Sequence, residues 1–160
     1  ETYVRAKTME AIEATHKKVD TALKAGGDAV GAQTVIATMP GQLPLACNNR
    51  LNELFVTNAK IAEPNVAVKD AGHFSASTDM GDVSHLLPVI HPFIGGVDGF
   101  LHTADFHVVD FKHAVLLPAK AFAMMIIDLL ADDAELARQI KAEHHPLLTK
   151  EEYILSLIHI

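Results

Sequence analysis

The sequence predicts a chain that mixes α-helices and β-strands, which places it in the α/β fold class. Apolar residues recur at helical spacing in three stretches, which begin near residues 8, 48 and 110. Short apolar or alternating segments closed by Pro and Gly lie between these stretches and are typical of strands and turns. The composition, 49% hydrophobic and 21% charged, is that of a folded domain.

Residues 1–41 predict a strand, a helix and a second strand. Residues 2–4 form the first expected strand, and Thr8 is the expected N-cap of the helix. Residues 33–39 alternate in polarity and are followed by a Pro-Gly turn. Two strands and one helix leave open sheet edges and little core, so this stretch predicts half of a larger domain.

Residues 42–154 predict further helices joined by short strands and loops. Asn48 or Asn49 can cap a second helix, and Asp110 can cap a third. Residues 66–68 and the apolar run 86–94 are expected strands, with a loop of small residues over 72–81. Pro118 either kinks the third helix or opens its main segment. Thr149 and Glu152 have the spacing of a capping box.

Charge and composition exclude some classes of function. The net charge is −7 with a pI near 5.7, and the 13 basic residues are scattered, so we expect no nucleic-acid partner. Cys47 is the single cysteine, which rules out an internal disulfide and favours a reducing, cytoplasmic location. Lys or Asp interrupts the apolar runs before a membrane span of roughly 20 residues, so we expect no membrane partner.

Histidines cluster in the middle of the chain, where six of the ten lie between residues 73 and 113. Histidine titrates near neutral pH and is the commonest metal ligand, so a metal site is one interpretation. Surface or capping histidines are the other. No H-x-D occurs, and no H-x-x-x-H lies on an expected helix, so spacing alone predicts no metal site. The six are His73, His85, His91, His102, His107 and His113.

The polar loop around Thr78, Asp79 and Asp82 leaves two interpretations open. Its hydroxyl and backbone groups suit a bound ligand, and the same residues suit a turn followed by a helix N-cap. The pair Glu151-Glu152 is better explained by the capping box than as a general base. Cys47 has no nearby histidine or cysteine in the sequence, which favours a structural thiol.

Four segments in this order resemble the metallopeptidases of family M-twenty: ETYVRAKTMEAI, STDMGDVSHLLPVIHPFIGG, HTADF and LPAKAFAMMIIDLL. The resemblance is strongest to the amidohydrolase branch that includes aminobenzoyl-glutamate hydrolase and related N-acyl-amino-acid and dipeptide hydrolases. It implies that residues 1–41 are the second half of a lid, or dimerisation, domain. Residues 42–154 would then be the C-terminal part of an α/β zinc-peptidase-like catalytic domain.

The resemblance also implies a function for the whole enzyme. A water activated by two divalent metal ions, zinc or alternatively manganese, would hydrolyse the amide bond of a small N-acyl amino acid or dipeptide. His102, in HTADF, matches one metal ligand of the family. The other ligands and the glutamate general base would lie upstream of this chain, so no catalytic residue is assigned within it. A homodimer through the lid domain is the implied assembly.

Four residues are assigned to the substrate side. By resemblance, Thr78, Asp79 and His91 lie near the cleft and hold the substrate or position other loops. Arg5, at the end of a lid strand, can pair with a substrate carboxylate, because arginine makes bidentate contacts, or can form a surface salt bridge.

Two further hypotheses remain open at this point. Because most metal ligands are missing, the chain can instead serve as a non-catalytic dimerisation or binding module, or belong to an inactive homologue. A His-rich metal-handling protein unrelated to hydrolases is the third interpretation. Residues 155–160, LSLIHI, resemble a translated sequencing adapter, which predicts a non-native tail.

Overall fold

The computed structural model describes residues 1–70, 72 and 76–156. The chain divides into two compact units. Unit 1 comprises Glu1–Ala46, Ala71–Leu86 and Pro146–Ile160, and unit 2 comprises Cys47–Asp70 and Leu87–His145. Both units are discontinuous in sequence, and the expected domain boundary near residue 41 stays a prediction. Most of the tail expected to be non-native, residues 157–160, lies outside the described residues.

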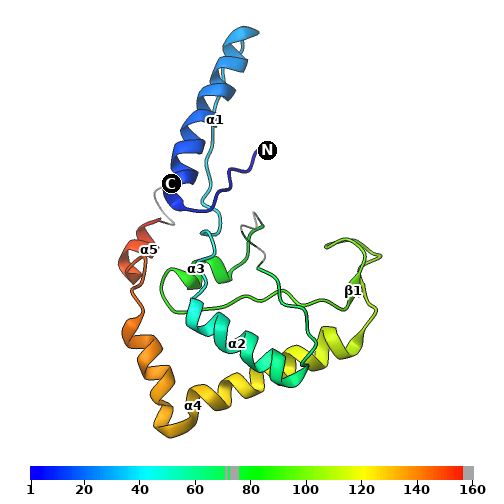
Figure 1. Ribbon diagram of the computed structural model, residues 1–160. Helices are drawn as coiled ribbons and strands as arrows, with labels where there is room; N and C mark the ends of the chain where they lie inside the picture. Colours follow the sequence, from blue (N-terminus) through cyan, green and yellow to red (C-terminus); the bar gives the residue numbers. More distant parts are fainter. Residues whose placement is uncertain (71, 73–75, 157–160) are drawn as a thin grey trace. The chain divides into compact units, whose positions relative to one another are not determined.

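The longest helix of unit 1 is α1, Met9–Ala29, and it begins where the sequence predicts. The Thr8 hydroxyl oxygen accepts a hydrogen bond from the Ala11 amide at 3.2 Å and so caps the first turn. Gly31 adopts φ +71°, and the chain then runs back along the helix (Figure 1). Thr34 donates to the Leu23 carbonyl at 3.4 Å across this return. No residue of α1 is buried.

The remaining helices of unit 1 are short. They are α3, Met80–Ser84, and α5, Lys150–Ser156. The predicted capping box at α5 is confirmed, because the Thr149 amide donates to Glu152 Oε2 at 2.7 Å and the Glu152 amide donates to Thr149 Oγ1 at 3.1 Å. The Thr149 amide is also the main reason that the pKa of Glu152 is lowered.

Unit 2 is built on two packed helices, α2, Asn49–Ala62, and α4, Leu117–Glu143. Asn48 caps α2 by accepting from the Leu51 amide at 3.1 Å, as predicted. The rings of Phe55 and Phe122 meet with centroids 5.0 Å apart. The buried core of the unit consists of Leu51, Phe55, Ala59, Ala121, Met125 and Ile140.

The predicted third helix has two local interruptions. A π-helical turn, η1, Lys112–Leu116, precedes α4, and Pro118 lies in the first turn of α4, so the proline opens the main segment. Asp132, Asp133 and Ala134 have positive φ values of 49–59° and break the helix, which the sequence did not predict. Leu136 and Ile140, beyond the break, still pack on the core.

The sheet content of the described residues is one short antiparallel pair, β1, Val97–Asp98, with β2, His107–Val108. The register joins Val97 to Val108 and Asp98 to His107. Gly99, at φ +86°, turns the chain after β1.

The strands predicted over residues 2–4, 33–39, 66–68 and 86–94 do not form in the structure. The alternation and β-propensity of a segment describe the segment alone, whereas a strand needs a hydrogen-bonded neighbour. None of the four segments is assigned such a neighbour among the described residues. The α/β class of a complete domain stays a prediction.

The helical run Lys112–Glu143 is long and apolar enough to cross a membrane by length and composition. Lys120 and Asp128 interrupt this run, and the expectation of no membrane partner stays a prediction. Ala121 and Met125 of the run are buried in the core with residues of α2, whereas most of its apolar stretch is not buried.

Candidate functional site

The motif Ser77–His85 contacts one neighbouring segment of unit 1, Gln42–Ala46, which we call the strap. Asp82 Oδ1 accepts from the Leu43 amide at 2.9 Å, and Ser84 Oγ accepts from the Ala46 amide at 3.0 Å. Ser84 is 1% exposed and also donates to the Gly81 carbonyl at 2.6 Å. Two side chains therefore satisfy backbone amides of the strap that would otherwise lack a partner in a poorly solvated place.

His85, at the C-terminal end of α3, also forms a hydrogen bond to the strap. Its Nε2 lies 2.9 Å from the Pro44 carbonyl oxygen, so this nitrogen carries the proton and donates. The His85 carbonyl accepts from the Leu148 amide at 3.1 Å, which ties the approach to α5 to the same place. His85 is 5% exposed and has its Nε2 proton committed to this bond, so its role in the structure is to hold the fold.

Thr78 and Asp79, the expected substrate-side residues of this motif, form the turn that leads into α3. The Thr78 carbonyl accepts from the Gly81 amide at 2.8 Å, and Thr78 Oγ1 accepts from the Met80 amide at 3.4 Å. Asp79 is exposed and accepts a hydrogen bond from the Gln42 side chain of the strap. The predicted turn therefore forms, but Asp79 makes no side-chain cap bond to α3, and its carboxylate lies at the surface. A ligand role for this loop stays a prediction.

Arg5, the remaining candidate in unit 1, is exposed near the start of the chain. Its guanidinium lies over the ring of Tyr3, with the central carbon 5.4 Å from the ring centroid. The hydroxyl of Tyr3 donates to Glu1 at 2.7 Å, and this bond is the main reason that the pKa of Tyr3 is raised. The structure therefore places Arg5 in a local surface cluster.

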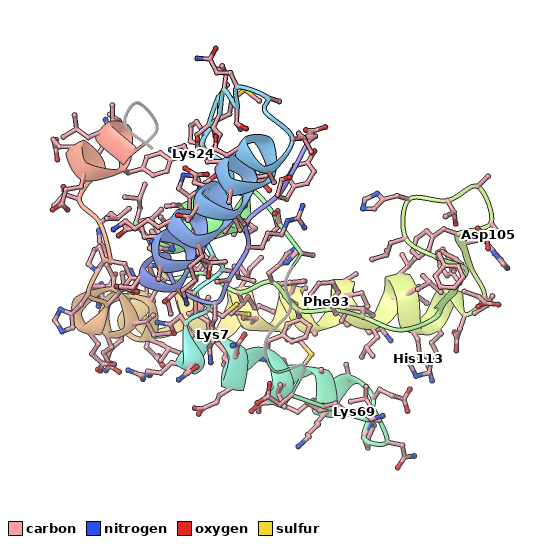
Figure 2. The ribbon with its side chains drawn as sticks, turned by 90° about the horizontal axis from the view of Figure 1, so that it is seen from above. Lys7, Lys24, Lys69, Phe93, Asp105 and His113 are labelled. Atoms are coloured by element: carbon pink, nitrogen blue, oxygen red, sulfur yellow. The ribbon has the colours of Figure 1, made fainter. Side chains whose placement is uncertain are left out.

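His91 in unit 2 has an unusual environment. The residue is half-buried, and its Nδ1 is buried without a hydrogen-bond partner among the described residues. Its ring meets Phe93 edge-on, with centroids 5.5 Å apart. Figure 2 labels Phe93 on the extended segment whose Ile90 and Ile94 pack on the core. A buried polar nitrogen without a partner costs about 1–3 kcal/mol, so a group outside the described residues is expected to satisfy it.

His102, the candidate metal ligand, lies in the loop between β1 and β2. The residue is exposed, and its backbone is left-handed with φ 65°, which is uncommon for a residue with a side chain. Thr103 and Asp105 bond to each other beside it, and Thr103 also donates to the Phe100 carbonyl at 2.6 Å. The loop around His102 is therefore tightly turned, and Figure 2 shows Asp105 within it.

The candidate residues do not combine into a metal centre. Among the described residues no group of three or more His, Cys, Asp or Glu side chains could hold a metal ion. Arg5, Thr78 and Asp79 belong to unit 1, whereas His91 and His102 belong to unit 2. His73, the first member of the predicted histidine cluster, lies outside the described residues. The residues present therefore do not by themselves fit a site for two metal ions.

The ion pair between Glu63 and Lys112, at the junction of α2 and η1, was not predicted. Lys112 Nζ lies 2.5 Å from Glu63 Oε2 and lowers the pKa of that carboxyl, chiefly through this hydrogen bond. His113 Nδ1 donates to Asp110 Oδ2 at 2.7 Å and is the largest cause of the lowered Asp110 pKa. Figure 2 labels His113 at this junction. The Asp110 cap was visible in the sequence, but the Glu63 contact joins positions 49 residues apart and had no local signal.

His144 is a second half-buried histidine that the sequence did not single out. Its Nε2 is buried without a partner in the described part of the chain, and its amide donates to the Ile140 carbonyl at 3.1 Å at the end of α4. The only local signal was its place just before Pro146, where a helix was expected to stop.

Comparison with known proteins gives one relationship. The chain is 28% identical to a mouse (Mus musculus) protein named Xaa-Arg dipeptidase, over 95% of this chain and 37% of that relative. The chain thus spans little more than a third of the relative's length. No family model matches the chain. No solved structure matches it. The chain is therefore distantly related to a dipeptidase, which supports a peptidase or hydrolase function in a general sense.

Proposed function

We propose that this chain is part of a metal-dependent amidohydrolase that cleaves the amide bond of small N-acyl amino acids or dipeptides. The observation that carries the proposal is the 28% identity to a dipeptidase over 95% of the chain. The order of the four segments that resemble family M-twenty agrees with that relationship. A cytoplasmic enzyme that needs no disulfide is consistent with the single Cys47.

The whole reaction would need residues beyond this chain. The chain covers 37% of its relative, and His102 is the one metal ligand that the motif resemblance assigns here. Because the residues present do not fit a two-metal site, we derive no step through the metals. We expect the remaining ligands and the general base in sequence upstream of residue 1.

His91 is the residue of this chain that we assign most firmly to the substrate. Its Nδ1 is buried and has no hydrogen-bond partner among the described residues, so this nitrogen keeps an unused hydrogen-bonding capacity that a ligand can satisfy once the groups covering it move. In the protonated form this nitrogen donates a hydrogen bond to a carbonyl or carboxylate oxygen of the substrate. Thr78, Asp79 and Arg5 are proposed as further substrate contacts, supported by the motif and, for Arg5, by its affinity for carboxylates.

A prediction for His91 follows. In the complete gene product, His91→Ala should raise KM or lower kcat, while the amount of bound metal measured by atomic absorption stays that of the unchanged enzyme. The matched control is His16→Ala, because His16 lies on the exposed helix α1 and pairs only weakly with Asp20 at 3.6 Å. Loss of bound metal in His91→Ala would show that His91 is a ligand and not a substrate residue.

The sequence upstream of residue 1 in the gene provides the first test of the proposed function. The proposal expects an H-x-D motif and a Glu-Glu pair there. The complete gene product, loaded with zinc or manganese, is then assayed against dipeptides ending in arginine and against N-acyl amino acids. Hydrolysis that a chelator abolishes supports the proposal, and an upstream sequence without those motifs contradicts it.

A non-catalytic dimerisation or binding module is the second candidate. The observation that favours it is that no metal-holding group of three side chains occurs among the described residues. In both candidates we propose that residues 1–41 mediate a homodimer, because α1 has no buried residue and exposes Leu23, which is 43% accessible. Sedimentation equilibrium distinguishes monomer from dimer, and a hydrolysis assay distinguishes the two candidates.

A further inference from the structure

Side chains of α3 form hydrogen bonds to the backbone amides of the strap. Asp82 and Ser84 accept from the amides of Leu43 and Ala46, and neither of these amides has a backbone partner among the described residues. Leu43 is buried at 5% exposure, so its amide has little access to water. Loss of either side-chain acceptor would leave a backbone donor unsatisfied.

The glycine of α3 makes this approach of the two segments close. A Cβ atom at Gly81 would overlap the carbonyl oxygen of Leu43, so only glycine allows the strap to lie this near to α3. The Gly81 amide, in turn, donates to the Thr78 carbonyl at 2.8 Å and closes the turn of Thr78 and Asp79. Gly81 therefore connects the strap on one side with the Thr78–Asp79 turn on the other.

Ser84 strengthens the same connection. Its hydroxyl oxygen accepts from the Ala46 amide and its proton goes to the Gly81 carbonyl, so one buried hydroxyl bridges the strap and the turn of α3. A hydroxyl that both donates and accepts has its direction determined by the two partners. The position of the Thr78–Asp79 turn is thus set by bonds that reach it from the strap.

We propose that Asp82 and Ser84 are positioning residues that clamp the strap to α3 and thereby hold the Thr78–Asp79 turn in place. This inference rests on the proposed function in one respect, namely that Thr78 and Asp79 contact the substrate. Asp82 and Ser84 touch no substrate in this scheme and act through the turn. The sequence interpretation had treated Asp82 as a ligand group or helix cap, whereas its bond to Leu43 assigns it to the strap.

Amide hydrogen exchange of the full 160-residue chain tests the proposal. Asp82→Ala should speed exchange at the Leu43 amide, and Ser84→Ala at the Ala46 amide, by roughly tenfold, because each change removes one hydrogen bond. Both variants should also speed exchange at the Gly81 amide, which reports on the Thr78–Asp79 turn. Asp82→Asn keeps an acceptor oxygen and should restore most of the protection that Asp82→Ala loses.

The control is Asp28→Ala, since Asp28 is an exposed aspartate at the end of α1 in the same unit. Unchanged exchange at Leu43 and Ala46 in the two alanine variants would overturn the clamp. Faster exchange at those amides with unchanged Gly81 protection would show that the clamp does not hold the turn. Failure of the complete gene product to hydrolyse any dipeptide or N-acyl amino acid would contradict the proposed function and leave the exchange result as it stands.

Discussion

Each of the two units of this protein is stabilised internally by a different kind of interaction. Unit 2 has a core of aliphatic and aromatic side chains from α2 and α4. Unit 1 contains the 21-residue helix α1, none of whose residues is buried, and the contacts described for its shorter segments are mainly hydrogen bonds around the strap. Apolar burial is not directional, whereas hydrogen bonds fix positions. The stability of unit 2 therefore depends mainly on how well apolar side chains fill its core, whereas the structure of unit 1 depends on the geometry of a few hydrogen bonds.

Removing core volume from unit 2 is expected to have the largest effect. Phe55 is 7% exposed and packs on Phe122, so Phe55→Ala should lower the free energy of unfolding by about 3–5 kcal/mol. At concentrations where the chain is monomeric, Leu23→Ala in unit 1 should lower it by less than about 0.5 kcal/mol, because that helix face is exposed in the monomer. Urea unfolding followed by circular dichroism measures both. Equal losses would show that α1 is packed as tightly as the core.

A steric clash introduced between α3 and the strap of unit 1 should change the free energy of unfolding by an intermediate amount. Gly81→Ala places a methyl group against the Leu43 carbonyl and should destabilise the chain by about 1–3 kcal/mol. Gly26→Ala is the matched control, because it lies within α1 with nothing within 4 Å of the added carbon. It should stabilise the chain by about 0.5–1 kcal/mol through better helix propensity. Thermal unfolding of both variants decides the sign of each change.

The smallest expected effect concerns the surface pair of Glu63 and Lys112. The Lys112 hydrogen bond lowers the pKa of Glu63 below its ordinary value of 4.5, so the folded state binds this proton less readily than the unfolded state. The contribution of the pair is therefore present above about pH 4.5 and is lost as the pH falls through the lower, folded pKa. Glu63→Gln should make unfolding less sensitive to pH in that acidic range, as measured by urea midpoints.

The control for this pair is Glu53→Gln, since Glu53 is an exposed glutamate on α2, the helix that ends just before Glu63. It should leave the acid dependence unchanged. An identical pH profile for Glu63→Gln and the unchanged chain would mean that solvent and salt screen the pair completely.

The starts of the helices were predictable because their signals are local. Thr8, Asn48 and Thr149 each accept from an amide three residues ahead, so the cap and the group it satisfies lie in the same short segment. The break at Asp132–Ala134 was not predictable, because two aspartates and an alanine carry no strong signal for positive φ. The predicted strands failed for a related reason, since their local patterns say nothing about a neighbouring strand.

The candidate site was predicted in part. The motif Ser77–Gly96 was identified from the sequence as a candidate cleft segment. The structure shows that several side chains of its first part, Ser77–His85, bond to the strap, which lies about 40 residues earlier in the chain. Substrate roles for Thr78, Asp79, His91 and Arg5, and the metal role of His102, remain predictions. For His91, the structure adds an observation that the sequence could not supply, namely a buried nitrogen without a hydrogen-bond partner in the described part of the chain.

By itself, the sequence determined the caps at Thr8, Asn48 and Thr149, the acidic character, the absence of an internal disulfide and the distant likeness to a dipeptidase. These properties depend on composition, on motif order or on residues a few positions apart. Only the tertiary structure decided that Asp82 and Ser84 bond to the strap and that Glu63 pairs with Lys112. It also decided that His91 Nδ1 has no hydrogen-bond partner within residues 1–70, 72 and 76–156. The physical reason is that hydrogen bonds and burial between distant segments depend on how the chain folds back on itself, and local sequence patterns do not encode that path.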